Sequence, residues 1–348
     1  MELDIPSVFD MDIGNDPDDT CVAVMLALDP KRYNPLLIIT NDEAQSKGRV
    51  RFLAEVVKQS GGELIVASGL PSCEKRKDTL VERAGLIPMN KADFIDNGIS
   101  YLSELLSINK KVNYFGLGAL TNLATVLAQH PEFADKINLI QMGPSFRGLY
   151  RKQAPQSNVR LDINSFKEVL SIVNNPTLLM SHSSWGNYAG KEGRQQIGIY
   201  TDDPLYDALA NSKNNGMKLF AEHLKVWKED GKPCSIMHDP LTVLSFYEKG
   251  IVDYTEGEIV FDNQGFTDLK EESKKGLSLL EPRRLMKLSG YINNQALTRN
   301  GMVKKVNFSL NTDYDLARKA IIQALFKDSY LELTSAWKDY NSTHKDIN

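Results

Sequence analysis

The chain has 348 residues, of which 42% are hydrophobic and 25% charged, and its formal net charge is −4. These values are ordinary for a soluble globular protein, and the mixed charges give no sign of a basic surface for nucleic acid. No apolar run approaches membrane-spanning length, and three widely spaced cysteines argue against a disulfide framework. We therefore expect a cytoplasmic protein with neither a nucleic-acid nor a membrane partner.

Short apolar strands alternate with helical segments along the first half of the chain. Strand patterns cover residues 6–10, 34–40, 63–69, 111–118, 136–143 and 177–181. Helical patterns cover residues 21–28, 48–59 and 121–127. This alternation is typical of βαβ units, which form a mainly parallel sheet with helices on its faces.

The C-terminal part of the chain is less regular, with short strands near residues 258–261 and 303–308 and an amphipathic helix at 314–326. We predict one α/β domain over residues 1–335. Its open, mainly parallel sheet is flanked by helices and carries a C-terminal helical and short-strand elaboration. Residues 336–348 are predicted to form a polar tail. In such sheets, ligands bind outside the carboxyl ends of the strands.

Five aspartates crowd into ten residues between the first strand and the first helix: Asp10, Asp12, Asp16, Asp18 and Asp19. Crowded carboxylates repel one another unless a positive group joins them, and Ca²⁺ and Mg²⁺ prefer several oxygen ligands. Asp10 and Asp12 are two apart on an extended segment, so their side chains point to the same side. Helix capping explains Asp16 and one of its successors, but not the two aspartates in the strand. A metal or substrate site is therefore favoured over capping alone.

Four motifs in the chain occur in the order found in a known family. Asp10-x-Asp12-x-Gly14-x-x-x-Asp18-Asp19 resembles the N-terminal signature of the inosine-uridine preferring nucleoside hydrolases, in the variant with two extra residues after the Gly. Residues 36–41, 116–124 and 237–239 resemble three further family motifs. Together the motifs span most of the chain, and they imply a nucleoside hydrolase-like fold.

The resemblance implies a Ca²⁺ ion at the bottom of the pocket. Its protein ligands would be Asp12, Asp19, the backbone carbonyl of Leu117, and Asp239, an all-oxygen set of the kind that a hard cation requires. The implied reaction is hydrolysis of the N-glycosidic bond of a ribonucleoside, or a related N-riboside, to free base and ribose. Asp12 would activate a metal-bound water as general base.

The resemblance also assigns roles to other residues. His238 would donate a proton to the departing base, and this interpretation competes with that of an ordinary helix-start histidine. Asp18, Asn41 and Asn158 would bind and orient the ribose. Asp10 would support the site from the first strand.

Two further residues are candidates for substrate binding. Gln156 stands where the family usually has a Glu that binds the ribose 5′-hydroxyl. A glutamine still forms hydrogen bonds but removes a negative charge, so the sequence leaves open whether the 5′ position of the substrate is modified. Trp185 is a candidate to stack on the base, although a single aromatic residue is more often a packing residue.

Two other function classes compete with the nucleoside hydrolase. A haloacid-dehalogenase-type phosphohydrolase also begins with Asp-x-Asp after a strand, but Gly14 stands where that class needs Thr or Val. A non-catalytic nucleoside- or sugar-binding relative would be favoured if Asp12 or Asp19 were missing, and both are present. The resemblance further implies a homo-oligomer, a dimer or tetramer. The motifs do not determine the preferred base.

Overall fold

A computed structural model describes residues 5–72, 78–87, 93–147, 154–185, 197–270, 301–327 and 329–343. A nine-stranded sheet forms its centre, in the order β10-β9-β11-β6-β5-β4-β1-β2-β3. The pairs from β3 to β11 are parallel, whereas β9 and β10 run antiparallel at one end. The nine strands are β1 (Ser7–Met11), β2 (Pro35–Thr40), β3 (Val66–Ala67), β4 (Val112–Gly116), β5 (Ile137–Met142), β6 (Thr177–Leu179), β9 (Val252–Phe261), β10 (Thr267–Leu269) and β11 (Met302–Thr312).

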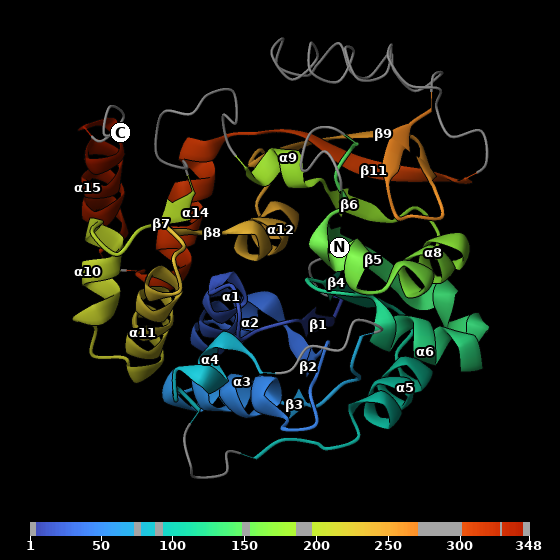
Figure 1. The fold of residues 1–348 in the computed structure, drawn as a ribbon, viewed down its shortest axis with the longest axis horizontal. Coiled ribbons are helices and arrows are strands. Elements are labelled where there is room, and N and C mark those ends of the chain that lie inside the picture. The colour runs from blue at the N-terminus through green and yellow to red at the C-terminus, as the bar shows by residue number, and fades with distance from the viewer. Residues whose placement is uncertain are drawn as a thin grey trace.

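Helices cover both faces of the sheet (Figure 1). One hydrophobic core packs the first face against α1 (Asp18–Leu28), α3 (Gly48–Gln59), α11 (Asn215–Glu229), α12 (His238–Tyr247) and α14 (Tyr314–Leu325). A second core packs the other face against α5 (Gly98–Ile108), α6 (Thr121–Gln129) and α8 (Ile163–Ile172). The remaining helices and short strands are α2 (Pro30–Tyr33), α4 (Leu80–Arg83), η2 (Pro131–Lys136), α7 (Ser157–Leu161), α9 (Ser181–Ser184), α10 (Pro204–Ala210), α15 (Tyr330–Thr343), β7 (Gly198–Ile199) and β8 (Ser235–Ile236).

The strand register brings distant parts of the sequence to one edge of the sheet. Asp10 of β1 pairs with Ile39 of β2 and with Gly116 of β4. The residues that follow these strands therefore meet at the carboxyl edge of the sheet, where ligands bind in open α/β sheets.

The fold confirms the predicted α/β class, with a mainly parallel sheet and a C-terminal elaboration built from β9, β10, β11, α14 and α15. β3 is shorter than the strand expected at residues 63–69. α15 runs across position 336, where the polar tail was predicted to begin, and Trp337 is fully buried. The division into a domain and a tail stays a prediction. Residues 344–348 lie outside the described residues.

Candidate active site

Three carboxylates meet where two helices begin. Asp18 and Asp19 open α1, and Asp239 lies in the first turn of α12. One carboxylate oxygen of each lies within 4.8 Å of the others, and all three side chains are buried. The backbone N–H groups of Asp19 and Asp239 donate to the two oxygens of Asp18, at 3.1 and 3.4 Å. Asp18 thus links the starts of both helices, where the positive ends of the helix dipoles favour negative charge.

The three carboxyl groups hold their protons more tightly than exposed carboxyls. Burial raises the pKa of Asp18, Asp19 and Asp239 well above the ordinary value, and the negative charge of the neighbouring carboxylates raises it further. Asp12 is one of the neighbours that act on all three. The site therefore attracts either protons or a cation.

The geometry of the cluster fits a hard divalent cation. Oxygen ligands of Ca²⁺ lie about 2.3–2.6 Å from the ion, so two ligands of one ion are at most about 5 Å apart. Asp19 Oδ1 is also buried without a hydrogen-bond partner among the described residues. A buried oxygen of this kind normally has a partner. A bound cation would provide one.

Two of the four expected metal ligands, Asp19 and Asp239, are in this cluster, and Asp18, expected on the ribose, stands with them. Asp12 is half-buried and lies outside this group of three. The carbonyl of Leu117 accepts a hydrogen bond from Asn158 Nδ2 at 2.8 Å and keeps a second lone pair. The assignment of metal-ligand and sugar-binding roles stays a prediction.

Asp10 is held by three side-chain donors. Asn41 Nδ2 and Asn122 Nδ2 donate to Oδ1 at 2.7 and 2.9 Å, and the Tyr114 hydroxyl donates to Oδ2. Burial raises the pKa of Asp10 to about 7, although these hydrogen bonds act in the opposite direction. The supporting role expected of Asp10 stays a prediction, for which these contacts offer a structural basis. Tyr114 and Asn122 were not predicted to support the site, because their donation to Asp10 depends on how β4 and α6 pack beside β1.

The three amides expected to bind the substrate are largely engaged within the protein. Asn41 is fully buried, and its Oδ1 accepts from the backbone N–H of Ala119 at 3.3 Å. The amide nitrogen of Asn158 donates to Leu117 and to Met142, and the carbonyl of Gln156 caps α7 by accepting from the N–H of Asn158 at 2.8 Å. In the conformation seen here these side chains organise the walls of the site.

His238 is half-buried beside Trp185, with ring centroids 5.8 Å apart. Its Nδ1 lies 2.5 Å from the Ser184 hydroxyl, which itself donates to the carbonyl of Ser181 at 3.0 Å. Because a hydroxyl has only one proton to donate, His238 carries its proton on Nδ1 in this arrangement, which leaves a lone pair on Nε2. Burial lowers the pKa of His238 to about 4, so the ring is neutral near pH 7.

A buried guanidinium supports the loop that carries Asp12. Arg49 of α3 is 1% exposed, and its Nη1 donates to the backbone carbonyls of Asp12 and Ile13. Its other nitrogens donate to the carbonyl and the carboxylate of Asp42, at 2.9 and 2.8 Å. Nothing in the sequence pattern singled out Arg49, because the loop and the helix meet only in the folded chain.

His223 of α11 attaches a third helix to the acidic loop. Its Nε2 donates to the carbonyl of Asn15 at 3.2 Å, and its Nδ1 accepts from the Thr20 hydroxyl at 2.8 Å. Burial lowers the pKa of His223 to about 3, so the ring is neutral in the folded protein. This residue was also missed by the sequence analysis.

Replacing His223 with Gln is expected to lower the free energy of unfolding by about 1–3 kcal/mol near neutral pH. His223 contributes less as the pH falls below 6.5, since the unfolded chain then binds a proton that the folded ring does not. The difference from wild type should therefore fall by about 2 kcal/mol, to a value near zero, between roughly pH 7.5 and pH 5. Urea unfolding of the metal-free proteins measures it. The exposed His130→Gln is the control, and an unchanged difference for His223→Gln would contradict the assignment.

The fold and the site define an α/β protein whose acidic cluster at the carboxyl edge of the sheet suits a divalent cation. The family model for inosine-uridine preferring nucleoside hydrolase matches residues 7–299, and the protein belongs to this family. It is accordingly an N-glycosyl hydrolase, a nucleosidase. No curated protein sequence matches the chain significantly.

Solved structures of nucleoside hydrolases share the fold at low sequence identity. A plant nucleoside hydrolase is 16% identical with a TM-score of 0.66, and the match covers 92% of this chain and 99% of that one. The inosine-uridine preferring enzyme of Bacillus anthracis is 15% identical with a TM-score of 0.63, over 93% and 99%. A purine-preferring ribonucleoside hydrolase from Gardnerella vaginalis is 15% identical with a TM-score of 0.62, over 96% and 100%. In the part of the chain that the structure describes, no helix has the length and apolar character needed to cross a bilayer.

Proposed function

We propose that the protein is a Ca²⁺-dependent ribonucleoside hydrolase that releases free base and ribose. The observation that carries the proposal is the convergence of Asp18, Asp19 and Asp239, with one buried oxygen of Asp19 lacking a hydrogen-bond partner among the described residues. All these donors are carboxylate oxygens, which favours Ca²⁺ or Mg²⁺ over softer metals. When bound, the cation would supply Lewis-acid chemistry beside the ribose.

The protein's own groups would divide the remaining work. Asp12 would accept a proton from the attacking water, and its half-buried position near the cluster, whose pKa values its charge raises, supports this role. Asp18, Asn41 and Asn158 would orient the ribose. His238 would protonate the leaving base after first acquiring a proton on Nε2, and Trp185 beside it would contact the base. Assembly as a dimer or tetramer and a cytoplasmic location stay predictions.

Turnover of a panel of purine and pyrimidine ribosides tests this function. We expect base release from at least one riboside, its loss after treatment with a chelator, and its recovery on adding Ca²⁺ but not Mg²⁺. Asp12→Asn is expected to lower kcat by at least about 100-fold with a smaller change in KM, because a general base acts mainly in the transition state.

The separate outcomes bear on separate parts of the proposal. If no riboside of the panel released its base, the proposed activity on ribonucleosides would be overturned. Release that survives the chelator would overturn the metal requirement, and recovery with Mg²⁺ alone would overturn the choice of Ca²⁺. Wild-type turnover by Asp12→Asn would remove Asp12 from the chemistry.

A further inference from the structure

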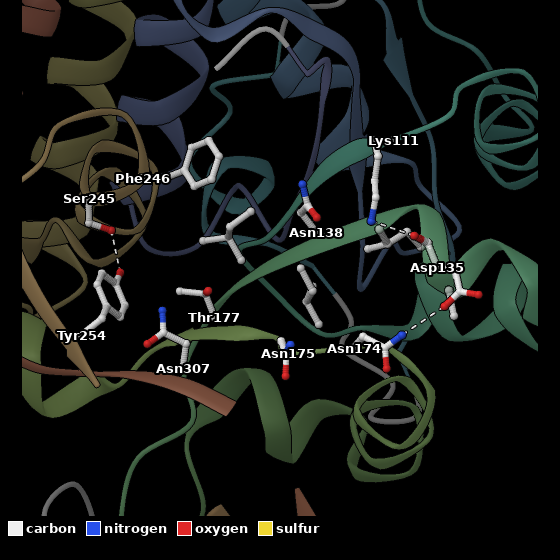
Figure 2. A pocket seen from close by; sticks show the side chains of 14 residues that line it. Lys111, Asp135, Asn138, Asn174, Asn175, Thr177, Ser245, Phe246, Tyr254 and Asn307 are labelled. Atoms are coloured by element: carbon white, nitrogen blue, oxygen red, sulfur yellow. Dashed lines mark hydrogen bonds between the residues drawn. The ribbon is translucent and has the colours of Figure 1, made fainter. Parts of the chain in front are cut away.

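A cavity of about 480 Å³ lies at the starting ends of β5 and β6, beside β11 (Figure 2). The acidic cluster is at the other edge of the sheet. α12 connects the two places, since Asp239 is in its first turn whereas Ser245 and Phe246 of its last turn line the cavity. Phe246 is seven positions after Asp239 along the helix, which corresponds to about 10 Å along the axis. The cavity is therefore a site separate from the acidic cluster.

Polar side chains occupy part of a sheet face that elsewhere packs largely into a hydrophobic core. Thr177 of β6 pairs with Ile140 of β5 and with Asn307 of β11, and Asn138 is two residues before Ile140. Paired residues and residues two apart point to the same face, so Asn138, Thr177 and Asn307 share the face on which Ile140 and Leu179 enter the core. α12 ends at Tyr247, and the three polar side chains line the cavity near its last turn (Figure 2).

These side chains have unused hydrogen-bonding capacity. The side chains of Thr177 and Asn307 form no hydrogen bond to other described residues. Asn138 donates through its amide nitrogen to Asn113 at 3.1 Å, and its own carbonyl oxygen can still accept. The lining thus offers both donors and acceptors to a ligand.

The opposite wall adds a hydroxyl and an aromatic ring. Ser245 donates its proton to the carbonyl of Thr242 at 3.0 Å, so the Tyr254 hydroxyl, 2.7 Å from Ser245 Oγ, is the donor in that pair. The Tyr254 oxygen therefore keeps a lone pair with which to accept. Phe246 is half-buried and supplies an apolar surface beside these groups (Figure 2).

Among the described residues that line the cavity, the charged groups stand at the rim, and they already have partners. The ammonium group of Lys111 donates to the backbone carbonyl of Asp135 at 2.8 Å, and the carboxylate of Asp135 accepts from Asn174 at 3.0 Å. Lys111, Asp135 and Asn174 are exposed, and the single positive charge is balanced by the single negative one. An anion would gain little here, whereas a neutral polar molecule would match the inner lining.

We propose that this cavity binds a neutral sugar of pentose or hexose size. Each sugar hydroxyl both donates and accepts, as the set formed by Asn138, Thr177, Asn307 and Tyr254 requires. The carbon-bound hydrogens of the sugar would lie against Phe246. The volume is within the range of about 300–1,000 Å³ that small-molecule sites occupy. The proposal does not depend on the metal or on the proposed reaction.

Saturation-transfer NMR with D-ribose and D-glucose tests this site, in protein treated with chelator so that the acidic cluster is stripped of metal. Inorganic phosphate is the charged probe. We expect sugar binding to wild type and an affinity about tenfold lower in Thr177→Val and in Asn307→Leu, each of which removes hydrogen bonds at similar volume. Thr125→Val on α6 makes the same chemical change away from the cavity and should bind as wild type does.

The outcomes separate this site from the acidic one. Asp239→Asn should retain sugar binding. Binding that is lost in Asp239→Asn but retained in Thr177→Val would place the sugar at the acidic cluster and overturn the proposal. The absence of saturation transfer to both sugars would overturn it as well, and so would phosphate binding that is lost in Thr177→Val. Circular dichroism and thermal unfolding show that each variant is folded.

Discussion

Asp239→Asn is expected to abolish base release while making the metal-free protein more stable. Changes in residues that only support metal ligands typically cost about 10–100-fold in affinity or activity, so loss of a ligand should lower kcat/KM by at least about 100-fold. Stability should change in the opposite direction, because Asp239 is buried against Asp18 and Asp19, and like charges there repel one another. We expect a gain of about 1–2 kcal/mol in metal-free protein at alkaline pH.

The pH dependence follows from the direction of the pKa shifts. The pKa values of Asp18, Asp19 and Asp239 are raised in the folded protein, so on raising the pH the unfolded chain loses these protons first. The contribution of these three carboxyl groups to the stability of the metal-free wild type should therefore fall as the pH rises above about 4. The advantage of Asp239→Asn should be largest at high pH and shrink toward pH 4.

Calorimetric titration measures the affinity for Ca²⁺, and thermal unfolding with and without Ca²⁺ measures the stability. Saturating Ca²⁺ at about 1,000 times its dissociation constant should stabilise wild type by about 4 kcal/mol and Asp239→Asn by much less. Asp207→Asn on α10 changes an exposed carboxylate in the same way and should behave as wild type. If Asp239→Asn gained the full stabilisation from Ca²⁺, Asp239 would not be a ligand.

Arg49→Gln is expected to lower the free energy of unfolding by about 3–5 kcal/mol, because it leaves the carboxylate of Asp42 buried without its cation. It also removes the donors to the carbonyls of Asp12 and Ile13, so kcat should fall in the protein that remains folded. Arg49→Lys keeps the charge but lacks the planar group that reaches several acceptors at once. We expect it to recover part of the stability and little of kcat.

Urea unfolding and steady-state kinetics below the unfolding transition measure these effects. Arg83→Gln is the matched control. The Arg83 side chain is about half exposed, and its Nη2 lies 3.7 Å from Asp230 Oδ1. Loss of this surface ion pair should cost less than about 1 kcal/mol. Equal losses for Arg49→Gln and Arg83→Gln, or full activity in Arg49→Lys, would show that Arg49 does not position the loop.

Much of the fold was predictable because its signals are local. The apolar run of β2 and the helical spacing of α3 are visible within ten or twelve residues, and their alternation indicates a parallel sheet. β3 was overestimated because an apolar run does not reveal how much of it pairs with a neighbour. Trp337 is fully buried although the residues around it are polar, which a local pattern does not reveal.

In the candidate site, too, the residues with a local sequence signal were predictable and those that depend on tertiary contacts were not. The aspartates of the first loop and the His238-Asp239 pair were recognisable as motifs. Their partners were not, because Tyr114, Arg49 and His223 lie 36 to 208 residues from the atoms of β1 and of the acidic loop that they contact. Gln156 illustrates a different difficulty. Its position in a family motif suggested contact with the substrate, which stays a prediction, and its carbonyl also caps α7, a contact that the motif did not indicate.

The sequence by itself determined the class of fold, the family, and the acidic loop on which the site is built, since these depend on residue type and order. Only the tertiary structure decided that Asp18, Asp19 and Asp239 converge, that Asp10 is held by three donors, and that polar side chains line a cavity at the other end of α12. The physical reason is that convergence depends on strand register and helix packing. Those relations join residues up to 221 positions apart.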